Sequence, residues 1–108
     1  MNRHQAVEEL LLQIESEMRG QSLWSRNKPS TEALQSSEPF CVDTLSFFQW
    51  VQWIMIPRFH EMISKQQPLP QSSSIAPMAE EALRLKKTNS QALLLLFNQL
   101  DNTLTLLR

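Results

Sequence analysis

Residues 45–57 read Leu-Ser-Phe-Phe-Gln-Trp-Val-Gln-Trp-Ile-Met-Ile-Pro, a stretch without formal charge that carries two of the three tryptophans and is followed at once by Arg58. Ser46 stands three residues before Gln49, which is the spacing of a capping box, so a helix is predicted to begin at residue 46. Pro57 removes a backbone donor and crowds the preceding turn, so this helix is predicted to kink there and to continue to about residue 67. The Pro-kinked helix is the centre of the predicted fold.

The central stretch has two unequal faces when it is read as a helix. The broad apolar face holds Phe47, Phe48, Trp50, Val51, Ile54 and Met55, and the opposite face holds Gln49, Gln52, Trp53 and Ile56. So much aromatic surface in a short chain forms either the centre of a core or a surface that binds a partner, and the sequence leaves both open. Trp53 and Ile56 lie among amides, which favours an exposed role for them.

Three further helices are predicted around the central one, at residues 2–19, 77–87 and 89–107. The first carries an apolar stripe at helical spacing, formed by Val7, Leu11, Ile14 and Met18. Gly20 is the only glycine of the chain. It is expected to close this helix in the left-handed conformation, so Gly20→Val is expected to cost stability.

Proline and capping patterns predict the boundaries in the second half of the chain. Proline is favoured at the first helical position, which places a helix start near Pro77. Thr88 stands three residues before Gln91, which predicts a second capping box and leaves only residues 87–89 as the joint of a tight helical hairpin. Residues 21–44 are rich in Ser, Pro and Asn, and we predict a long connection there with a single turn at residues 30–34.

The composition also favours an all-α protein. The chain of 108 residues contains one glycine, six prolines and no tyrosine, and it has few of the β-branched residues that strands need. A chain of this length buries roughly 65% of its unfolded surface on folding, which is enough for one core. We therefore expect a single domain, residues 1–108, folded as a four-helix bundle with a long connection between its first two helices.

Several chemical functions lack the residues that they require. His4, His60 and Cys41 are the only nitrogen and sulfur ligands of the usual kind, and none lies at ligand spacing from another, so no metal site is expected. A phosphate-binding loop needs more than one glycine. Nucleophilic catalysis by Cys41 with His60 is formally open because the fold decides their distance, but we assign no catalytic residue and expect no cofactor.

Charge and hydropathy predict a cytoplasmic protein with no membrane segment and no strong nucleic-acid signal. A formal net charge of -1 gives no broad positive field to attract a phosphate backbone. The apolar central stretch is shorter than the about 20 residues that span a bilayer. The first residues lack the basic-then-apolar order of a secretory signal, and the single cysteine cannot form an intramolecular disulfide.

Arg58 is the residue that the helical pattern explains least. On an unbroken helix it points into the middle of the apolar stripe, where a guanidinium needs a carboxylate. Either the kink turns it outward and it pairs with Asp43, Glu61 or Glu80, or it anchors a carboxylate or phosphate of a partner. We predict one partner-binding surface, composed of Phe40, Asp43, Trp53, Ile56, Pro57, Arg58 and His60.

Three segments carry a family resemblance: Pro-Phe-Cys-Val-Asp-Thr-Leu (39–45), Gln-Trp-Val-Gln-Trp-Ile-Met-Ile-Pro-Arg (49–58) and Ile-Ala-Pro-Met-Ala-Glu-Glu (75–81). Together they resemble the YqcC-like family of small bacterial proteins, and the likeness covers nearly the whole chain. The resemblance implies a helical bundle and a cytosolic protein of unassigned activity. The family has also carried the label tRNA pseudouridine synthase C, which we interpret as association with that enzyme.

The label itself does not fit the residues of a synthase. Pseudouridine synthases set a catalytic aspartate, commonly with a tyrosine beside it, in a mixed α/β domain far larger than this chain. This chain has no tyrosine, and its only aspartates are Asp43 and Asp101. Neither lies in a sequence that reads as such an active site.

Three functions follow from these observations. The favoured one is a protein-interaction or accessory module with a protein partner and without enzymatic activity. The alternative is a role in RNA modification, as a helper of a tRNA pseudouridine synthase or, less favoured, as the synthase itself. A third function, binding of a small molecule between helices, predicts a pocket beside the kink at Pro57.

Overall fold

The computed structural model describes residues 3–70, 73–86 and 90–106, and within these ranges the chain is helical, with no β-strand. In chain order the elements are α1 (Arg3–Gly20), α2 (Thr31–Leu34), the 3-10 turn η1 (Pro39–Cys41), α3 (Phe47–Trp50), the π-helical segment η2 (Val51–Met55), α4 (Ile56–Ser64), α5 (Ala76–Leu85) and α6 (Gln91–Leu106). The predicted all-α class is confirmed. The four predicted helices correspond to α1, the continuous run α3–η2–α4, α5 and α6, and the single turn predicted in the long connection is α2.

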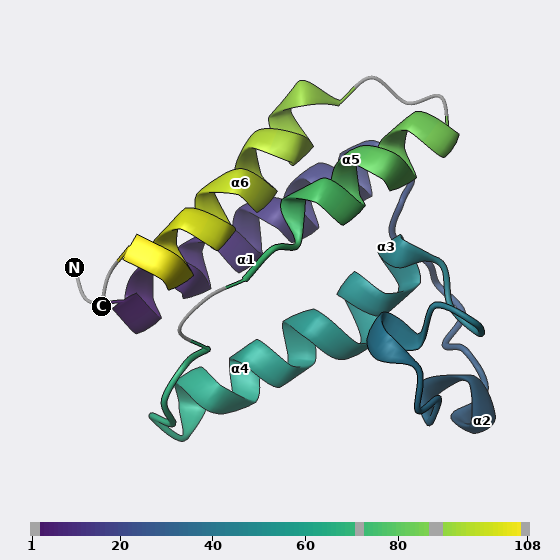
Figure 1. Cartoon of the computed structure of the whole chain (residues 1–108), viewed down its shortest axis with the longest axis horizontal. Helices are drawn as coiled ribbons and strands as arrows, with labels where there is room; N and C mark the ends of the chain where they lie inside the picture. The colour runs from purple at the N-terminus through teal and green to yellow at the C-terminus, as the bar shows by residue number, and fades with distance from the viewer. Residues whose placement is uncertain (1–2, 71–72, 87–89, 107–108) are drawn as a thin grey trace.

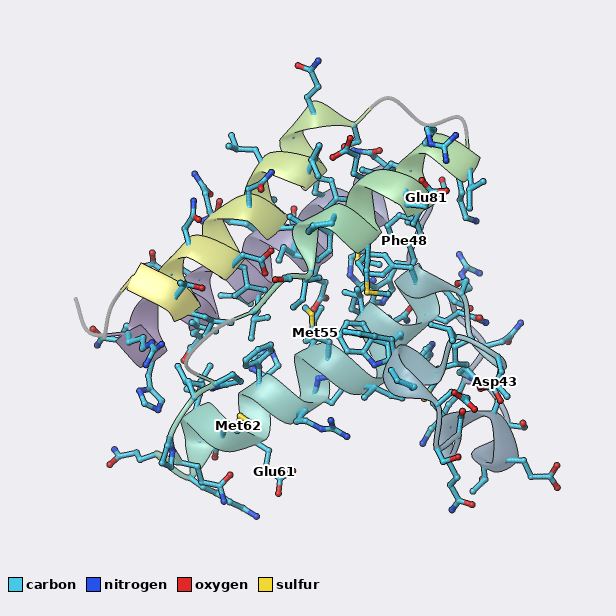
Figure 2. All side chains as sticks on the ribbon, in the orientation of Figure 1. Asp43, Phe48, Met55, Glu61, Met62 and Glu81 are labelled. Carbon is cyan, nitrogen blue, oxygen red and sulfur yellow. The ribbon has the colours of Figure 1, made fainter. Side chains whose placement is uncertain are left out.

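The helices surround one apolar core (Figure 1). α6 lies against α1 and α5, α4 contacts α1, and α3 contacts α5. Side chains from each of the longer helices build this core, among them Val7, Leu11, Ile14, Met18, Phe48, Val51, Met55, Phe59, Ala79, Leu83, Leu93, Phe97, Leu100 and Leu104. Figure 2 shows Phe48 and Met55 on the inner side of the central helix, whereas Glu61 points away from α4.

α1 buries the predicted apolar stripe but ends differently from the prediction. Gly20 belongs to the helix and has no positive φ, and the left-handed residue is Ser22, with φ of 60°. The Leu23 N–H donates to the Met18 carbonyl at 2.8 Å across this turn, which is the bond that closes a Schellman motif. The predicted conformation of Gly20 is therefore wrong. Because a Cβ at Gly20 meets no atom within 4 Å, the expected cost of Gly20→Val loses its basis.

The central helix begins at the predicted capping box. The Gln49 N–H donates to Ser46 Oγ at 3.2 Å, and the Ser46 N–H donates to Gln49 Oε1 at 2.8 Å. These two bonds satisfy two of the donors that a helix start leaves unpaired. The helix ends at Ser64, earlier than the predicted residue 67, and Gln66 closes it in a left-handed conformation with φ of 53°.

A π-helical turn interrupts this helix directly before Pro57. The Ile56 N–H donates to the carbonyl of Val51, five residues back along the chain. Pro57 has no N–H to donate into the preceding turn, so a regular α-helical bond is missing there in any case. The irregularity that the sequence predicted at Pro57 takes the form of this wide turn, and a bend of the helix axis stays a prediction.

The wide turn changes which residues face the core. One extra residue in a turn rotates the following side chains by about 100° relative to an α-helical reading. Ile56 follows the turn and was predicted on the outer face, yet it is only 4% exposed. Gln52 was also predicted on the outer face and is only 5% exposed, but it lies at the start of the turn, where this rotation does not act. Ile56 is part of the core, so its predicted place on a partner surface is wrong.

Asp101 of α6 caps the start of α5. Its carboxylate accepts hydrogen bonds from the N–H of Ile75 at 3.0 Å and of Ala76 at 2.8 Å, and from the hydroxyl of Ser73. A negative charge is favourable at the positive end of a helix dipole. The predicted start near Pro77 is close to the observed start, but the cap comes from another helix and had no local signal in the sequence.

α6 begins at a serine cap. Ser90 Oγ accepts from the Leu93 N–H at 3.1 Å, and Ser90 is only 8% exposed. α6 then packs against α5, as expected for neighbouring helices. The cap predicted at Thr88 and the joint predicted at residues 87–89 lie outside the described residues.

Candidate functional site

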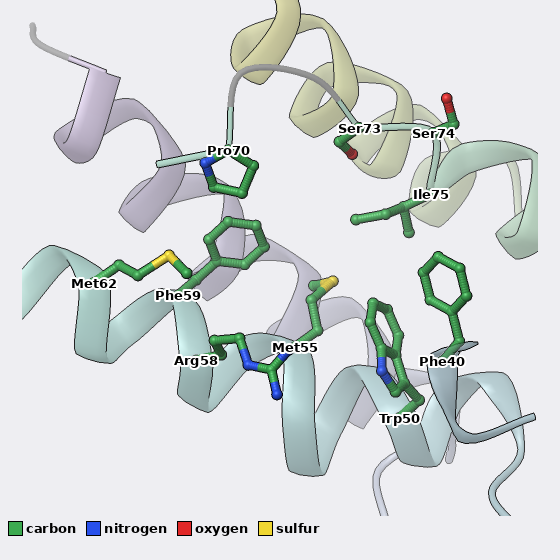
Figure 3. A pocket seen from close by; sticks show the side chains of 10 residues that line it. All are labelled: Phe40, Trp50, Met55, Arg58, Phe59, Met62, Pro70, Ser73, Ser74 and Ile75. Carbon is green, nitrogen blue, oxygen red and sulfur yellow. The ribbon is translucent and has the colours of Figure 1, made fainter. Parts of the chain in front are cut away.

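An apolar pocket of about 240 Å³ lies between the central helix, η1 and the connection that leads to α5 (Figure 3). It is lined by three aromatic residues, two methionines, one arginine and part of the connection: Phe40, Trp50, Phe59, Met55, Met62, Arg58, Pro70 and 73–75. Among these lining residues Arg58 alone carries a formal charge. We call this site the Arg58 pocket.

One face of the central helix supplies four of the lining residues. Met55, Arg58, Phe59 and Met62 follow the spacing i, i+3, i+4 and i+7, which places four side chains on one face of a helix. Met55 and Phe59 are buried, Met62 is half-buried and Arg58 is exposed. This face therefore leads from the core to solvent, and the pocket opens along it.

Phe40 forms one end of the pocket. Its ring packs edge-on against Trp50, with ring centroids 4.8 Å apart and an interplanar angle of 71°. Phe40 and Cys41 both have positive φ, 57° and 52°, a conformation that costs a non-glycine residue on the order of 1–2 kcal/mol. The Leu45 N–H holds the turn by donating to the Cys41 carbonyl at 2.8 Å. Backbone strain of this kind is concentrated at binding sites. Phe40, which lies in this strained turn, is 37% exposed.

Arg58 takes part in none of the ion pairs between described residues, which are Arg19–Glu15, Lys65–Glu61 and Arg84–Glu81. Glu61, one of the acids predicted to pair with it, bonds Lys65 at 2.9 Å, and Asp43 accepts from the Ser36 hydroxyl at 2.5 Å. The hydrogen bond from Lys65 is the main cause of the lowered pKa of Glu61, and the charge of Arg58 adds a smaller effect. The predicted internal ion pair of Arg58 is therefore not formed.

The other residues predicted for the partner surface do not line the pocket. Pro57 and His60 are exposed on a different face of α4, Asp43 is exposed after η1, and Ile56 lies in the core. Trp53 is half-buried, and its indole N–H is buried and finds no hydrogen-bond acceptor among the described residues. Of the seven predicted residues, two line the pocket, namely Phe40 and Arg58.

Eight of the ten lining residues were not predicted as part of the site. Trp50 and Met55 belong to the apolar face whose role, core or partner surface, the sequence left open, and Phe59 and Met62 continue the same stripe. The signal that points to them is Arg58 itself. A charged residue inside an apolar stripe marks the place where the stripe reaches solvent, because a buried guanidinium without a partner is too costly.

A buried glutamine fixes the long connection to the central helix. The Ser25 N–H donates to Gln52 Oε1 at 2.8 Å, and Gln52 Nε2 donates to the Ser25 carbonyl at 2.7 Å. These bonds occupy both polar atoms of the amide, which explains how a glutamine tolerates burial. We call this pair the Gln52–Ser25 clamp. The prediction that Gln52 lies on the outer face is therefore wrong.

The described residues assemble no set that is typical of catalysis or metal binding. No group of three or more His, Cys, Asp or Glu side chains in these ranges could hold a metal ion. Cys41 is buried while His60 is exposed on α4, which speaks against a nucleophilic pair. Asp43 and Asp101 are both hydrogen-bonded and neither lines the Arg58 pocket.

Within the described residues, every helix is too short or too polar to cross a bilayer.

Comparisons with known proteins agree with one another. The family model described as DUF446, tRNA pseudouridine synthase C, matches residues 6–103. The uncharacterized protein YqcC of Escherichia coli (strain K12) is 32% identical over 101 residues, covering 94% of this chain and 93% of that protein. The solution NMR structure of YqcC from E. coli matches with a TM-score of 0.83 at 31% identity, covering 96% of this chain and 89% of that chain.

A second relative is much longer than this chain. The tRNA pseudouridine synthase C of Pectobacterium carotovorum subsp. carotovorum is 36% identical over 72 residues, which cover 67% of this chain but only 19% of that protein. The likeness to YqcC, by contrast, extends over nearly the whole length of both chains in sequence and in structure. Together with the family model, it shows that this chain belongs to the YqcC-like DUF446 family.

Proposed function

We propose that this chain is an accessory module that binds a protein partner through the Arg58 pocket and its rim. The observation that carries the proposal is the composition of this surface, in which aromatic and methionine side chains surround one exposed guanidinium. Phe, Trp, Met and Arg are the residues enriched at the centres of protein interfaces. Phe40, which lines the pocket, is 37% exposed, and Val42, two residues further along the chain, is 61% exposed.

The size of the pocket favours a side chain over a cofactor or metabolite. The small-molecule alternative predicted a pocket beside the kink at Pro57, and the Arg58 pocket lies along the same helix, although Pro57 itself does not line it. Its volume of about 240 Å³ is below the roughly 300–1,000 Å³ that is usual for small-molecule sites. One large apolar side chain of a partner fills a space of this size, so binding of a protein explains the pocket better than binding of a nucleotide.

A helper role beside a tRNA pseudouridine synthase is the second candidate. The observation in its favour is the long Pectobacterium relative, in which the stretch similar to this chain makes up 19% of a protein named as the synthase. A module that occurs within one polypeptide can occur elsewhere as a separate partner of the same enzyme. The cytoplasmic location that the sequence predicts suits such a partner.

The residues of this chain favour the helper over the enzyme itself. A synthase needs an aspartate free to act as a nucleophile, and this chain has only two aspartates. The Asp101 carboxylate accepts hydrogen bonds from backbone N–H groups at the start of α5, and the Asp43 carboxylate accepts one from the Ser36 hydroxyl in an exposed loop. We therefore infer that the family label describes an association and that isomerisation of uridine is carried out by another polypeptide.

Capture of a partner by purified variants tests the first proposal. We expect the chain to capture a partner from the lysate of its native cell, and Arg58→Gln and Phe40→Ala to abolish this capture. Arg26→Gln is the matched control, because Arg26 is an exposed arginine that does not line the pocket. Circular dichroism verifies that each variant is folded. Equal capture by all four proteins would contradict the proposal, and so would the absence of a partner.

Modification of tRNA tests the second candidate. The purified chain alone is expected to isomerise no uridine in unmodified tRNA, and to raise the rate when it is added to a tRNA pseudouridine synthase. The Arg58→Gln variant is expected to lose this stimulation. An unchanged rate in the presence of the chain removes the helper role, and pseudouridine formed by the chain alone shows that it is an enzyme.

A further inference from the structure

We infer that the Arg58 pocket takes one aromatic or large aliphatic side chain from a partner segment that carries a carboxylate directly beside this side chain. The inference rests on the proposed protein-binding function and specifies the chemistry of the segment that is bound. It follows from the size of the pocket, from the nature of its walls and from the position of its charge.

The volume sets the number of side chains. A cavity of about 150 Å³ is sufficient to hold a benzene molecule, and the Arg58 pocket has about 240 Å³. It therefore has room for one ring with its connecting methylene groups and for little more. A second bulky residue of the partner must lie outside the pocket.

The walls favour an aromatic or aliphatic group. The rings of Phe40 and Trp50 meet edge-on at 4.8 Å, and the same geometry is preferred by an additional ring packed between aromatic side chains. Met55 and Met62 have flexible, polarizable side chains that adapt to the shape of an inserted group. Figure 3 shows both methionines on the same helix as Arg58, on either side of it along the axis.

The charge favours a carboxylate. Arg58 is the only charged residue of the lining, and it forms no ion pair with a described residue. Its closest acidic neighbour along the helix, Glu61, is engaged by Lys65 at 2.9 Å. A guanidinium matches a carboxylate by two parallel hydrogen bonds, so an acidic group is its natural partner.

The rest of the pocket offers little competing polarity. The hydroxyl of Ser73 donates to Asp101, and Figure 3 shows the hydroxyl of Ser74 turned away from the cavity. The more open hollow between α3 and α5 is different, since its lining contains both Glu81 and Lys86. A segment with an apolar group beside a negative charge is therefore complementary to the Arg58 pocket and not to the second hollow.

Two short peptides test the inference by nuclear magnetic resonance titration of the full chain. The first is N-acetyl-phenylalanyl-aspartyl amide, and the second is its uncharged asparaginyl analogue. We expect both to shift the resonances of residues that line the pocket, and the acidic peptide to bind about fivefold more tightly, as for an exposed ion pair. Arg58→Gln removes this preference, Arg58→Lys retains part of it, and Arg26→Gln leaves it unchanged.

Three results would overturn the inference: equal affinity for the two peptides, resonance shifts confined to the hollow between α3 and α5, or a preference that persists in Arg58→Gln. The thermal unfolding of each variant is measured alongside, so that a loss of fold is not read as a loss of binding. Failure of this inference can be distinguished from failure of the proposed function. If acidic peptides bind but no protein is captured, the proposed function fails, whereas capture that survives Arg58→Gln removes the acidic specificity.

Discussion

The α1–α6 pair and the α3–η2–α4 helix differ in helical regularity and in burial. α1 and α6 are unbroken helices whose apolar stripes are fully buried, with Val7, Ile14, Phe97 and Leu100 each 0% exposed. The central helix contains a π-helical turn, and beside it η1 holds two residues with positive φ. It also places aromatic side chains at a pocket that reaches solvent. The regular pair therefore forms a fully buried part of the core, and the irregular helix lines the pocket.

Phe97→Ala is expected to have the largest effect on stability. Phe97 is completely buried in α6 and its ring meets that of Phe47 edge-on, with centroids 5.5 Å apart. Removal of such a ring costs about 3–5 kcal/mol. Urea unfolding of Phe97→Ala measures this loss. The control is Leu95→Ala on the same helix, which is 57% exposed and should change stability by less than about 0.5 kcal/mol.

Gln52→Ala is expected to cost about 2 kcal/mol, because it leaves the backbone N–H and carbonyl of Ser25 without their partners. Urea unfolding gives the magnitude, and Gln99→Ala on the exposed side of α6 is the matched control. Amide hydrogen exchange should also be faster in the connection around Ser25. An unchanged unfolding midpoint would show that the Gln52–Ser25 clamp does not stabilise the central helix.

Gly20→Ala should make the protein more stable. Gly20 lies within α1, and an added Cβ meets no atom within 4 Å. Alanine is favoured over glycine in a helix by roughly 0.5–1 kcal/mol. A rise of the thermal midpoint checks this expectation. A lower midpoint would mean that Gly20 needs the left-handed conformation that the sequence first suggested.

Arg58→Gln should have the smallest effect on stability, below about 0.5 kcal/mol, because Arg58 is exposed and forms no ion pair with a described residue. The same variant is expected to lose the partner. This combination distinguishes a binding residue from a structural one. A loss of stability of about 2 kcal/mol or more would show that Arg58 supports the fold.

The stripe of the first helix and the start of the central helix could be predicted because their signals are local. The stripe of α1 and the capping box of Ser46 and Gln49 depend on residues three or four positions apart, and both are confirmed. The cap of α5 could not be predicted in this way, since Asp101 comes from a different helix, 25 residues away from Ala76. A long-range partner of this kind leaves no periodic trace in the sequence.

The central helix was predicted in position, and Phe48, Val51 and Met55 of its inner face are buried as expected. Two residues of its outer face were placed wrongly. A turn with bonds between residues five apart has no side-chain signature and turns Ile56 into the core, whereas Gln52 is buried where it bonds Ser25. The candidate site was affected in the same way. Arg58 and Phe40 were predicted as site residues, but the two methionines of the pocket were not, because they lie on the same apolar stripe that forms the core.

The most direct test of the division between the two halves is amide hydrogen exchange of the chain alone and in complex with the captured partner. We expect slower exchange in the complex around η1 and along residues 55–62, with little change in α1 and α6. Slower exchange confined to α1 and α6, with η1 and residues 55–62 unchanged, would contradict it.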